Sequence, residues 1–180
     1  MKIIGFCGLP GSGKSKALDA IKEMGYIVNM GDIIRNEAEK RNLDPTDLEL
    51  GKIARELREK EGLGVIAQKS IELINDLDQE IIFIDGLRSM EEILVFRKYW
   101  KFPVIAIIID EKRRYELIKE RARRDDPKSY NELRLRDNRE TSFGLKKVIE
   151  NADYFVTNNT SIMDLEKQVK KLVNSIIKQY

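Results

Sequence analysis

The stretch GLPGSGKS, residues 8–15, places three glycines, a lysine and two serines directly after an apolar run. The spacing G-x-x-x-x-G-K-[ST] is met by Gly8, Gly13, Lys14 and Ser15. Glycines let backbone N–H groups converge on phosphate oxygens without side-chain clashes, and the lysine can reach the outer phosphates. A glycine-rich turn with a surface lysine is the alternative, but it does not require a strand before and a helix after. We predict an ATP phosphate loop made of Gly8, Leu9, Pro10, Gly11, Ser12, Gly13, Lys14 and Ser15.

A carboxylate and two arginines follow later apolar runs. Asp85 comes directly after IIFI, where a P-loop protein carries the aspartate that orders the Mg²⁺ shell, so we expect Ser15 and Asp85 to serve a Mg²⁺ cofactor. Arg35 and Arg88 each follow a predicted strand, and we expect them to converge on a second phosphate. The alternatives are a helix-capping Asp32 and arginines in surface ion pairs. The predicted acceptor site consists of Gly31, Asp32, Arg35, Gly86 and Arg88.

Arginines gather again late in the chain, around an acidic break. The segment ERARRDDPKSYNELRLRD contains Arg121, Arg123, Arg124, Arg134 and Arg136. One interpretation is a charged pair of helices on the surface. The other is a lid, because phosphoryl transfer needs cations on the migrating group once water is excluded. We predict catalytic roles for Arg124 and Arg134, together with Lys14, Asp32 and Arg88.

Composition narrows the possible functions. The chain has 180 residues, enough for one domain over 1–180, and its 33 basic and 31 acidic residues give a net charge of only +2. This balance gives no strong argument for a nucleic-acid partner, and the phosphate loop indicates small-molecule nucleotides as ligands. The absence of histidine excludes histidine-based catalysis, and a single cysteine excludes an internal disulfide. No run approaches the roughly twenty apolar residues of a membrane helix, so we expect a cytoplasmic monomer or small homo-oligomer without a membrane partner.

The elements that must position these residues alternate along the chain. Apolar runs predict strands at 2–7, 26–30, 81–85, 103–109 and 153–158. Helical patterns cover 14–24, 89–100, 111–123, 130–140 and 161–179, and a longer one over 31–77 is broken by NLDPTD and by EGLG. Alternation of this kind predicts an α/β fold with a parallel sheet covered by helices on both faces. Segments 32–77 and 124–140 exceed simple crossovers, and we expect them to fold over the carboxyl edge of the sheet.

The motifs GLPGSGKS, GDIIR and FIDGLR, in this order, resemble those of the nucleoside monophosphate kinase group of P-loop proteins. Adenylate kinases are the most similar, dephospho-coenzyme A kinases come next, and the chain is identified as a member of the archaeal adenylate-kinase-related family. The resemblance implies a P-loop fold with a five-stranded parallel sheet, an acceptor-binding insertion over 32–77 and a lid over 124–140. It also places Asn158 beside the donor adenine and Arg121 on ATP.

The resemblance implies ATP-dependent phosphoryl transfer to a small phosphate-bearing acceptor such as AMP. The two families align different late arginines: Arg123 and Arg134 in one, Arg121 and Arg124 in the other. A hydroxyl acceptor of the dephospho-coenzyme A type would require a base, for which Asp32 is the candidate. A non-catalytic adenine-nucleotide sensor is the third possibility.

Overall fold

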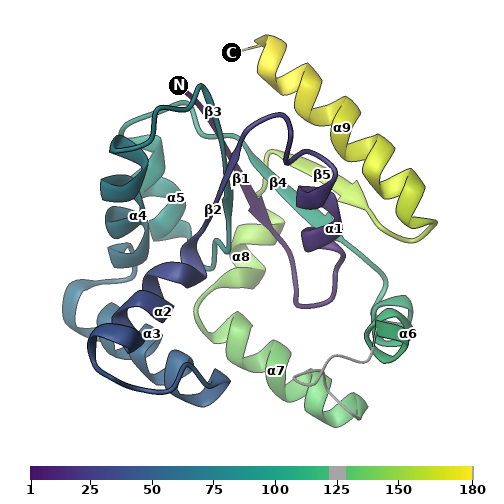
Figure 1. The fold of residues 1–180 in the computed structure, drawn as a ribbon. Coiled ribbons are helices and arrows are strands. Elements are labelled where there is room, and N and C mark those ends of the chain that lie inside the picture. Colours follow the sequence, from purple (N-terminus) through teal and green to yellow (C-terminus); the bar gives the residue numbers. More distant parts are fainter. Residues whose placement is uncertain (122–128, 180) are drawn as a thin grey trace.

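A five-stranded parallel sheet forms the centre of the molecule, with strand order β2-β3-β1-β4-β5 (Figure 1). The computed structural model describes residues 1–121 and 129–179, apart from the side chains of residues 47, 121 and 139. The strands are β1 (Lys2–Cys7), β2 (Tyr26–Asn29), β3 (Ile81–Asp85), β4 (Val104–Ile108) and β5 (Tyr154–Thr157). The described helices are α1 (Lys14–Asp19), α2 (Met30–Lys40), α3 (Asp47–Glu61), α4 (Val65–Asn75), α5 (Met90–Arg97), α6 (Glu111–Arg121), α7 (Tyr130–Ser142), α8 (Leu145–Glu150) and α9 (Ile162–Gln179). The predicted α/β fold is confirmed.

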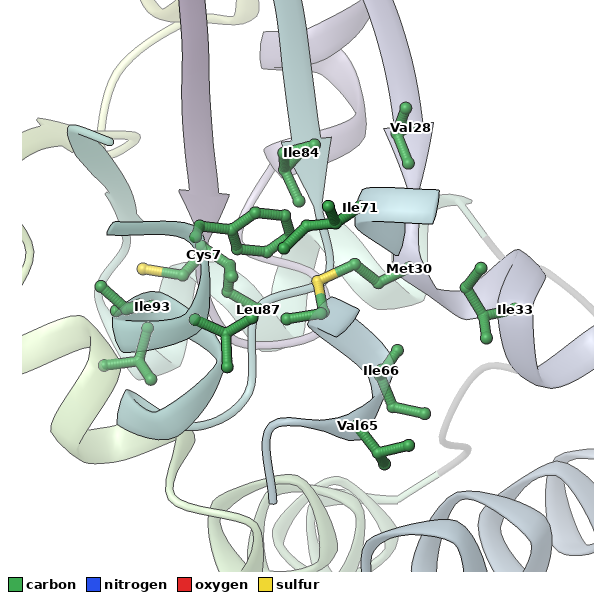
Figure 2. Close-up of a cluster of buried hydrophobic side chains, with 14 of the residues drawn as sticks. Cys7, Val28, Met30, Ile33, Val65, Ile66, Ile71, Ile84, Leu87 and Ile93 are labelled. Atoms are coloured by element: carbon green, nitrogen blue, oxygen red, sulfur yellow. The ribbon is translucent and has the colours of Figure 1, made fainter. Parts of the chain in front are cut away.

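Helices cover both faces of the sheet, and the central strand β1 has apolar side chains on each of them. Ile3 and Cys7 point into a large core with α2, α3, α4, α5 and α8, part of which appears in Figure 2. Ile4 and Phe6 point into a second core with α1 and α9. Successive strand residues face opposite sides, and a strand that is apolar at nearly every position must therefore be covered twice.

The long helical stretch after β2 forms three helices that pack beside the sheet (Figure 1). Asn29 caps α2 by accepting a hydrogen bond from the backbone N–H of Gly31 at 2.8 Å, so Asp32 is not the cap. Thr46 caps α3 through the N–H of Glu49. The predicted breaks at NLDPTD and EGLG thus separate α2, α3 and α4. Each break coincides with an end of a helix because its residues supply a cap or a glycine.

Two local predictions were wrong. The helix predicted over 14–24 ends at Asp19, because the chain then tightens into turns in which the N–H of Ile21 bonds Leu18 and that of Met24 bonds Ile21. The late helical segment also contains a separate helix, α8, which begins after Gly144 at φ +106°. Across 1–121 and 129–179, no helix is both long and apolar enough to cross a bilayer.

Candidate functional site

The phosphate loop leaves β1 at the carboxyl edge of the sheet and leads directly into α1. Gly13 has φ +98°, and a Cβ built there would lie 2.3 Å from the Asn158 amide nitrogen. Only glycine fits this combination of left-handed backbone and close neighbour. The same Asn158 nitrogen donates a 2.9 Å hydrogen bond to the Ser12 carbonyl. Asn158 therefore holds the phosphate loop by a hydrogen bond, a role that was not predicted. Its predicted place was beside adenine, and it also lines the adjoining cavity.

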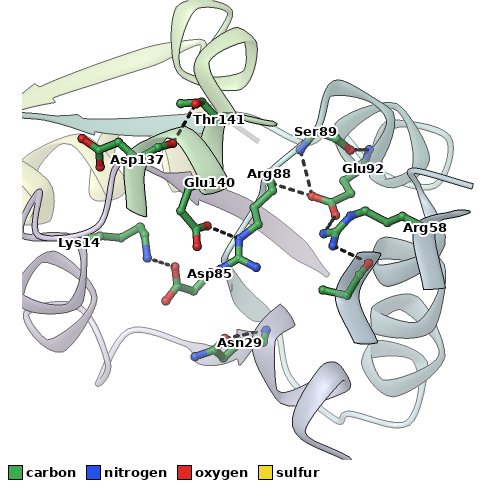
Figure 3. Close-up of polar contacts among 12 residues, drawn as sticks. Lys14, Asn29, Arg58, Asp85, Arg88, Ser89, Glu92, Asp137, Glu140 and Thr141 are labelled. Carbon is green, nitrogen blue, oxygen red and sulfur yellow. Dashed lines mark hydrogen bonds and ion pairs between the residues drawn. The ribbon is translucent and has the colours of Figure 1, made fainter. Parts of the chain in front are cut away.

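Lys14 and Asp85 meet across the central strands. Asp85 ends β3, where it stands in register with Phe6 of β1. The Lys14 ammonium donates to the Asp85 carboxylate at 2.5 Å, as Figure 3 shows. The side chains of the two residues are 21% and 14% exposed, so the pair is accessible to a ligand. Ser15 follows Lys14 in the first turn of α1, and both residues line the adjoining cavity.

The residues of the phosphate loop, together with Asp85, fit a nucleotide with bound Mg²⁺. Ser15 and Asp85 offer oxygen ligands of the kind that Mg²⁺ takes, and phosphate oxygens and water would complete the shell of the ion. The buried Ser12 hydroxyl also finds no hydrogen-bond partner within the described part of the chain.

Burial raises the pKa of the Cys7 thiol to about 12, against the opposing effect of Lys14, so this neighbour of the loop stays protonated.

Arg88 is held by the turn that follows β3. Ser89 and Glu92 form a capping box at the start of α5. The Glu92 carboxylate accepts the backbone N–H groups of Arg88 at 2.7 Å and Ser89 at 3.2 Å. Glu92 is fully buried and binds the Arg58 guanidinium of α3 at 2.8 Å (Figure 3). Helix α3 thereby helps to fix the backbone that presents Arg88.

The Arg88 side chain turns toward α7 and pairs with Glu140. The guanidinium Nε and the Glu140 carboxylate are 2.8 Å apart (Figure 3). Both residues line a cavity of about 560 Å³ that extends to the phosphate loop. Its lining includes Gly8, Leu9, Pro10, Gly11, Gly13, Lys14, Ser15, Gly86, Arg88, Leu117, Arg136, Glu140, Asn158 and Ile162. One cavity thus joins the phosphate loop to a cationic side chain that could bind a second phosphate.

Of the other predicted acceptor residues, Gly86 belongs to this lining, whereas Gly31, Asp32 and Arg35 lie outside it. Asp32 and Arg35 pair with each other on α2 at 2.5 Å, with about half of each side chain exposed. Gly31 and Gly86 are neighbours, because a Cβ on Gly86 would lie 3.9 Å from the Gly31 nitrogen. The strand ends therefore adjoin as expected, but Arg88 turns to Glu140 and Arg35 to Asp32. The expected convergence of the two arginines is not present in this structure.

The late arginines divide into three groups. Arg123 and Arg124, with Asp125 and Asp126, lie outside the described residues, as do all other residues of 122–128. Arg121 ends α6, and its side chain is not described. Arg134 is exposed on α7 and does not line the cavity, whereas Arg136 on the same helix does.

Several structurally important residues were not predicted. Glu140 and Asp137 of α7, Arg114 of α6, and the buried pair of Arg58 and Glu92 were all missed. The spacing S-x-x-E at 89–92 is a capping-box pattern and could have identified Glu92. No sequence signal separates Arg114 from its neighbour Arg113, because the helical phase that buries one of them depends on what the helix packs against.

The parallel sheet and the phosphate loop between β1 and α1 define a P-loop protein. A family model described as an AAA domain matches residues 7–141. Among solved structures, TT1252 of Thermus thermophilus superposes with a TM-score of 0.64 and 19% identity over 97% of both chains. Shikimate kinase of Acinetobacter baumannii, in complex with shikimate, gives 0.56 and 15%, covering 97% of this chain and 94% of its own. These likenesses establish the fold.

Curated relatives identify the family. A UPF0200 protein of Hyperthermus butylicus is 39% identical over 98% of this chain and 96% of its own. A UPF0200 protein of Methanosarcina barkeri is 37% identical, with 99% and 98% covered. A UPF0200/UPF0201 protein of Archaeoglobus fulgidus is 43% identical over 99% of this chain, which spans 57% of that longer relative. The chain belongs to the UPF0200 family, and the resemblance to the archaeal adenylate-kinase-related group is confirmed.

Proposed function

We propose that the protein is a Mg²⁺-dependent kinase that transfers the γ-phosphoryl group of ATP to a small phosphate-bearing acceptor, a nucleoside monophosphate such as AMP. The observation that carries this proposal is the single cavity that runs from Lys14 of the phosphate loop to Arg88. A donor on the loop and an acceptor phosphate on Arg88 would face each other across it. A sensor that only binds nucleotide has no need of a second cationic subsite.

The residues present suit the chemistry of phosphoryl transfer. The bond between the γ-phosphorus and the β–γ bridging oxygen breaks, and an acceptor phosphate oxygen forms the new bond, which gives ADP and a nucleoside diphosphate. Lys14 would stabilise the charge that develops on the phosphates. When bound at Ser15 and Asp85, Mg²⁺ supplies further charge neutralisation. An ionised phosphate oxygen is already nucleophilic, so the acceptor needs no general base.

A hydroxyl acceptor is the second candidate, and one observation favours it. Glu140 places a nearly buried carboxylate in the cavity beside Arg88. A carboxylate in this position could accept the proton of an attacking hydroxyl. Asp32, the base expected from the sequence, lies outside the cavity lining and is paired with Arg35. A dephospho-coenzyme A-like acceptor would therefore depend on Glu140 and not on Asp32.

The test is coupled ADP production with ATP and Mg²⁺ against AMP, CMP, UMP, GMP and dephospho-coenzyme A. Lys14→Ala serves as the blank, and we expect Arg88→Ala to raise the KM for the acceptor at least tenfold. Arg35→Ala is the matched control, since Arg35 lies outside the cavity, and its acceptor KM should change less than threefold. Turnover with a monophosphate supports the main proposal. Turnover with dephospho-coenzyme A alone, lost in Glu140→Gln, supports the second. Tight nucleotide binding without any turnover would refute both and leave a sensor.

A further inference from the structure

Arg114 of α6 is a buried arginine that contacts both the phosphate loop and α7. Its side chain is only 2% exposed. The guanidinium donates to the Pro10 carbonyl at 3.1 Å and grips the Asp137 carboxylate with two nitrogens, one of them 2.8 Å from its oxygen. Such two-pronged contacts fix orientation as well as distance. Arg114 therefore ties a backbone atom of the loop to a side chain on a distant helix.

The packing around Gly11 makes this link stiff. Gly11 has φ +81°, and a Cβ built there would lie 2.6 Å from Ile118 and 3.5 Å from the Cγ of Arg114. Helix α6 thus rests directly on the loop backbone. Helices α6 and α7 also meet through the rings of Tyr115 and Tyr130, whose centres are 5.6 Å apart at an angle of 86°. Because packed interiors resist small displacements, a shift of the loop would be passed on to α6 and α7.

The same face of α7 reaches the second phosphate subsite. Asp137 and Glu140 are three residues apart in a helix, so they lie on one face. Asp137 binds Arg114, while Glu140 binds Arg88 at 2.8 Å. Figure 3 shows both carboxylates on this helix, with Glu140 turned toward Arg88. A continuous series of contacts therefore runs from the loop carbonyl of Pro10 to the Arg88 guanidinium.

We propose that Arg114 and Asp137 are positioning residues that couple nucleotide binding on the phosphate loop to the placement of Arg88. Phosphates held on the loop fix the Pro10 carbonyl, Arg114 follows it, and Asp137 carries α7 with Glu140 into the position that orients Arg88. An ion pair that only joined α6 to α7 would need Arg114 and Asp137 alone, but here the guanidinium also binds the Pro10 carbonyl of the loop. The inference rests on nucleotide binding within the proposed function but is independent of which acceptor is used.

The test is hydrogen exchange of the full chain with and without ADP and Mg²⁺, read by mass spectrometry over residues 130–142. In the wild type, we expect nucleotide to slow exchange in α7 by about fivefold or more, the lower end of typical site-to-site coupling. Arg114→Met and Asp137→Asn should each lose this α7 response while the phosphate loop is still protected. Arg114→Lys should lose most of it, because an ammonium cannot bridge the carboxylate and the carbonyl in the same fork geometry. Arg113→Met is the matched control, since Arg113 is adjacent but its side chain is 38% exposed and pairs with Glu116 of its own helix.

The outcomes separate coupling from stability and from catalysis. Each variant is first checked for cooperative unfolding and for ADP affinity by calorimetry, and Asp137→Asn, which keeps the side-chain shape, replaces Arg114→Met if the latter does not fold. Equal protection of α7 in wild type and variants would overturn the proposal, as would protection of the loop alone in the wild type. Failure of the wild type to bind ADP would overturn both the coupling and the proposed function. Binding with α7 protection but no turnover would refute only the kinase assignment.

Discussion

Breaking the buried pair of Arg58 and Glu92 offers a quantitative test of how α3 supports the turn that holds Arg88. The Arg58 side chain is 3% exposed and that of Glu92 is fully buried, with 2.8 Å between nitrogen and oxygen. Arg58→Met keeps much of the aliphatic volume but leaves the Glu92 carboxylate without its cation. Removing one member of a buried pair costs about 3–5 kcal/mol, because a buried charge is left uncompensated.

The surroundings of Glu92 place the expected loss near the lower end of this range. Its carboxylate still accepts two backbone N–H groups, those of Arg88 and Ser89. We therefore expect a loss of about 3 kcal/mol in the free energy of unfolding. For a chain of this length, such a loss lowers the melting temperature by roughly 6–12 °C. Adding Glu92→Gln removes the stranded charge and keeps an acceptor for the backbone, so the double variant should recover part of the loss.

The assay is urea unfolding of the wild type, both single variants and the double variant, combined as a double-mutant cycle. Arg97→Met is the matched control, because Arg97 pairs with Asp153 at the same 2.8 Å but with more than a third of each side chain exposed. Its cost should stay below about 1 kcal/mol. Equal losses for Arg58→Met and Arg97→Met, or a coupling energy near zero between Arg58 and Glu92, would show that burial of the pair does not control its contribution.

Two further predictions concern the phosphate loop. Gly13→Ala should abolish ADP binding and destabilise the fold by roughly 1–3 kcal/mol, because alanine would be strained at φ +98° and would collide with Asn158. The control is Gly51→Ala, which lies at an open helical position and should be neutral or stabilising. Calorimetry measures ADP binding and urea unfolding measures stability in both variants. Burial raises the pKa of the Cys7 thiol from 9.0 to about 12. Because the thiolate is the reactive form, Cys7 should react with iodoacetamide at pH 8 about a thousandfold more slowly in the native protein than in urea. Comparable rates in the two conditions would contradict its burial.

The sheet and the phosphate loop were predictable because their signals are local. An apolar run such as 81–85 specifies a strand by its own composition, and the residue after it must emerge at the carboxyl edge. This reasoning expected Lys14, Asp85 and Arg88 at one edge of the sheet; in the structure Lys14 pairs with Asp85, and Lys14 and Arg88 line one cavity. It also placed the two breaks that separate α2, α3 and α4, because Thr46 and the glycines of EGLG act within a few residues of themselves.

Side-chain partners were less predictable because they depend on how helices pack. The sequence pointed to Arg35 and Arg88 as a converging pair, yet Glu140, more than fifty residues beyond Arg88, takes one of them and Asp32 takes the other. Helix α6 is so rich in charge that its apolar stripe does not stand out, which concealed the burial of Arg114. The predicted length of α1 was also wrong, since the chain after Asp19 forms turns in place of a continuing helix.

The pairing of Arg88 with Glu140 and of Lys14 with Asp85 has a kinetic consequence. Cavities lined by one sign of charge draw oppositely charged ligands from a distance, and association then slows steeply as salt is added. Here each of these cations already has a carboxylate beside it, so the field that an approaching anion meets is weak beyond the contact distance. An anionic ligand would arrive by unassisted diffusion and then exchange with the resident carboxylates. Its association rate constant would vary little with ionic strength. Differences in affinity among ligands would then come mainly from their dissociation rates.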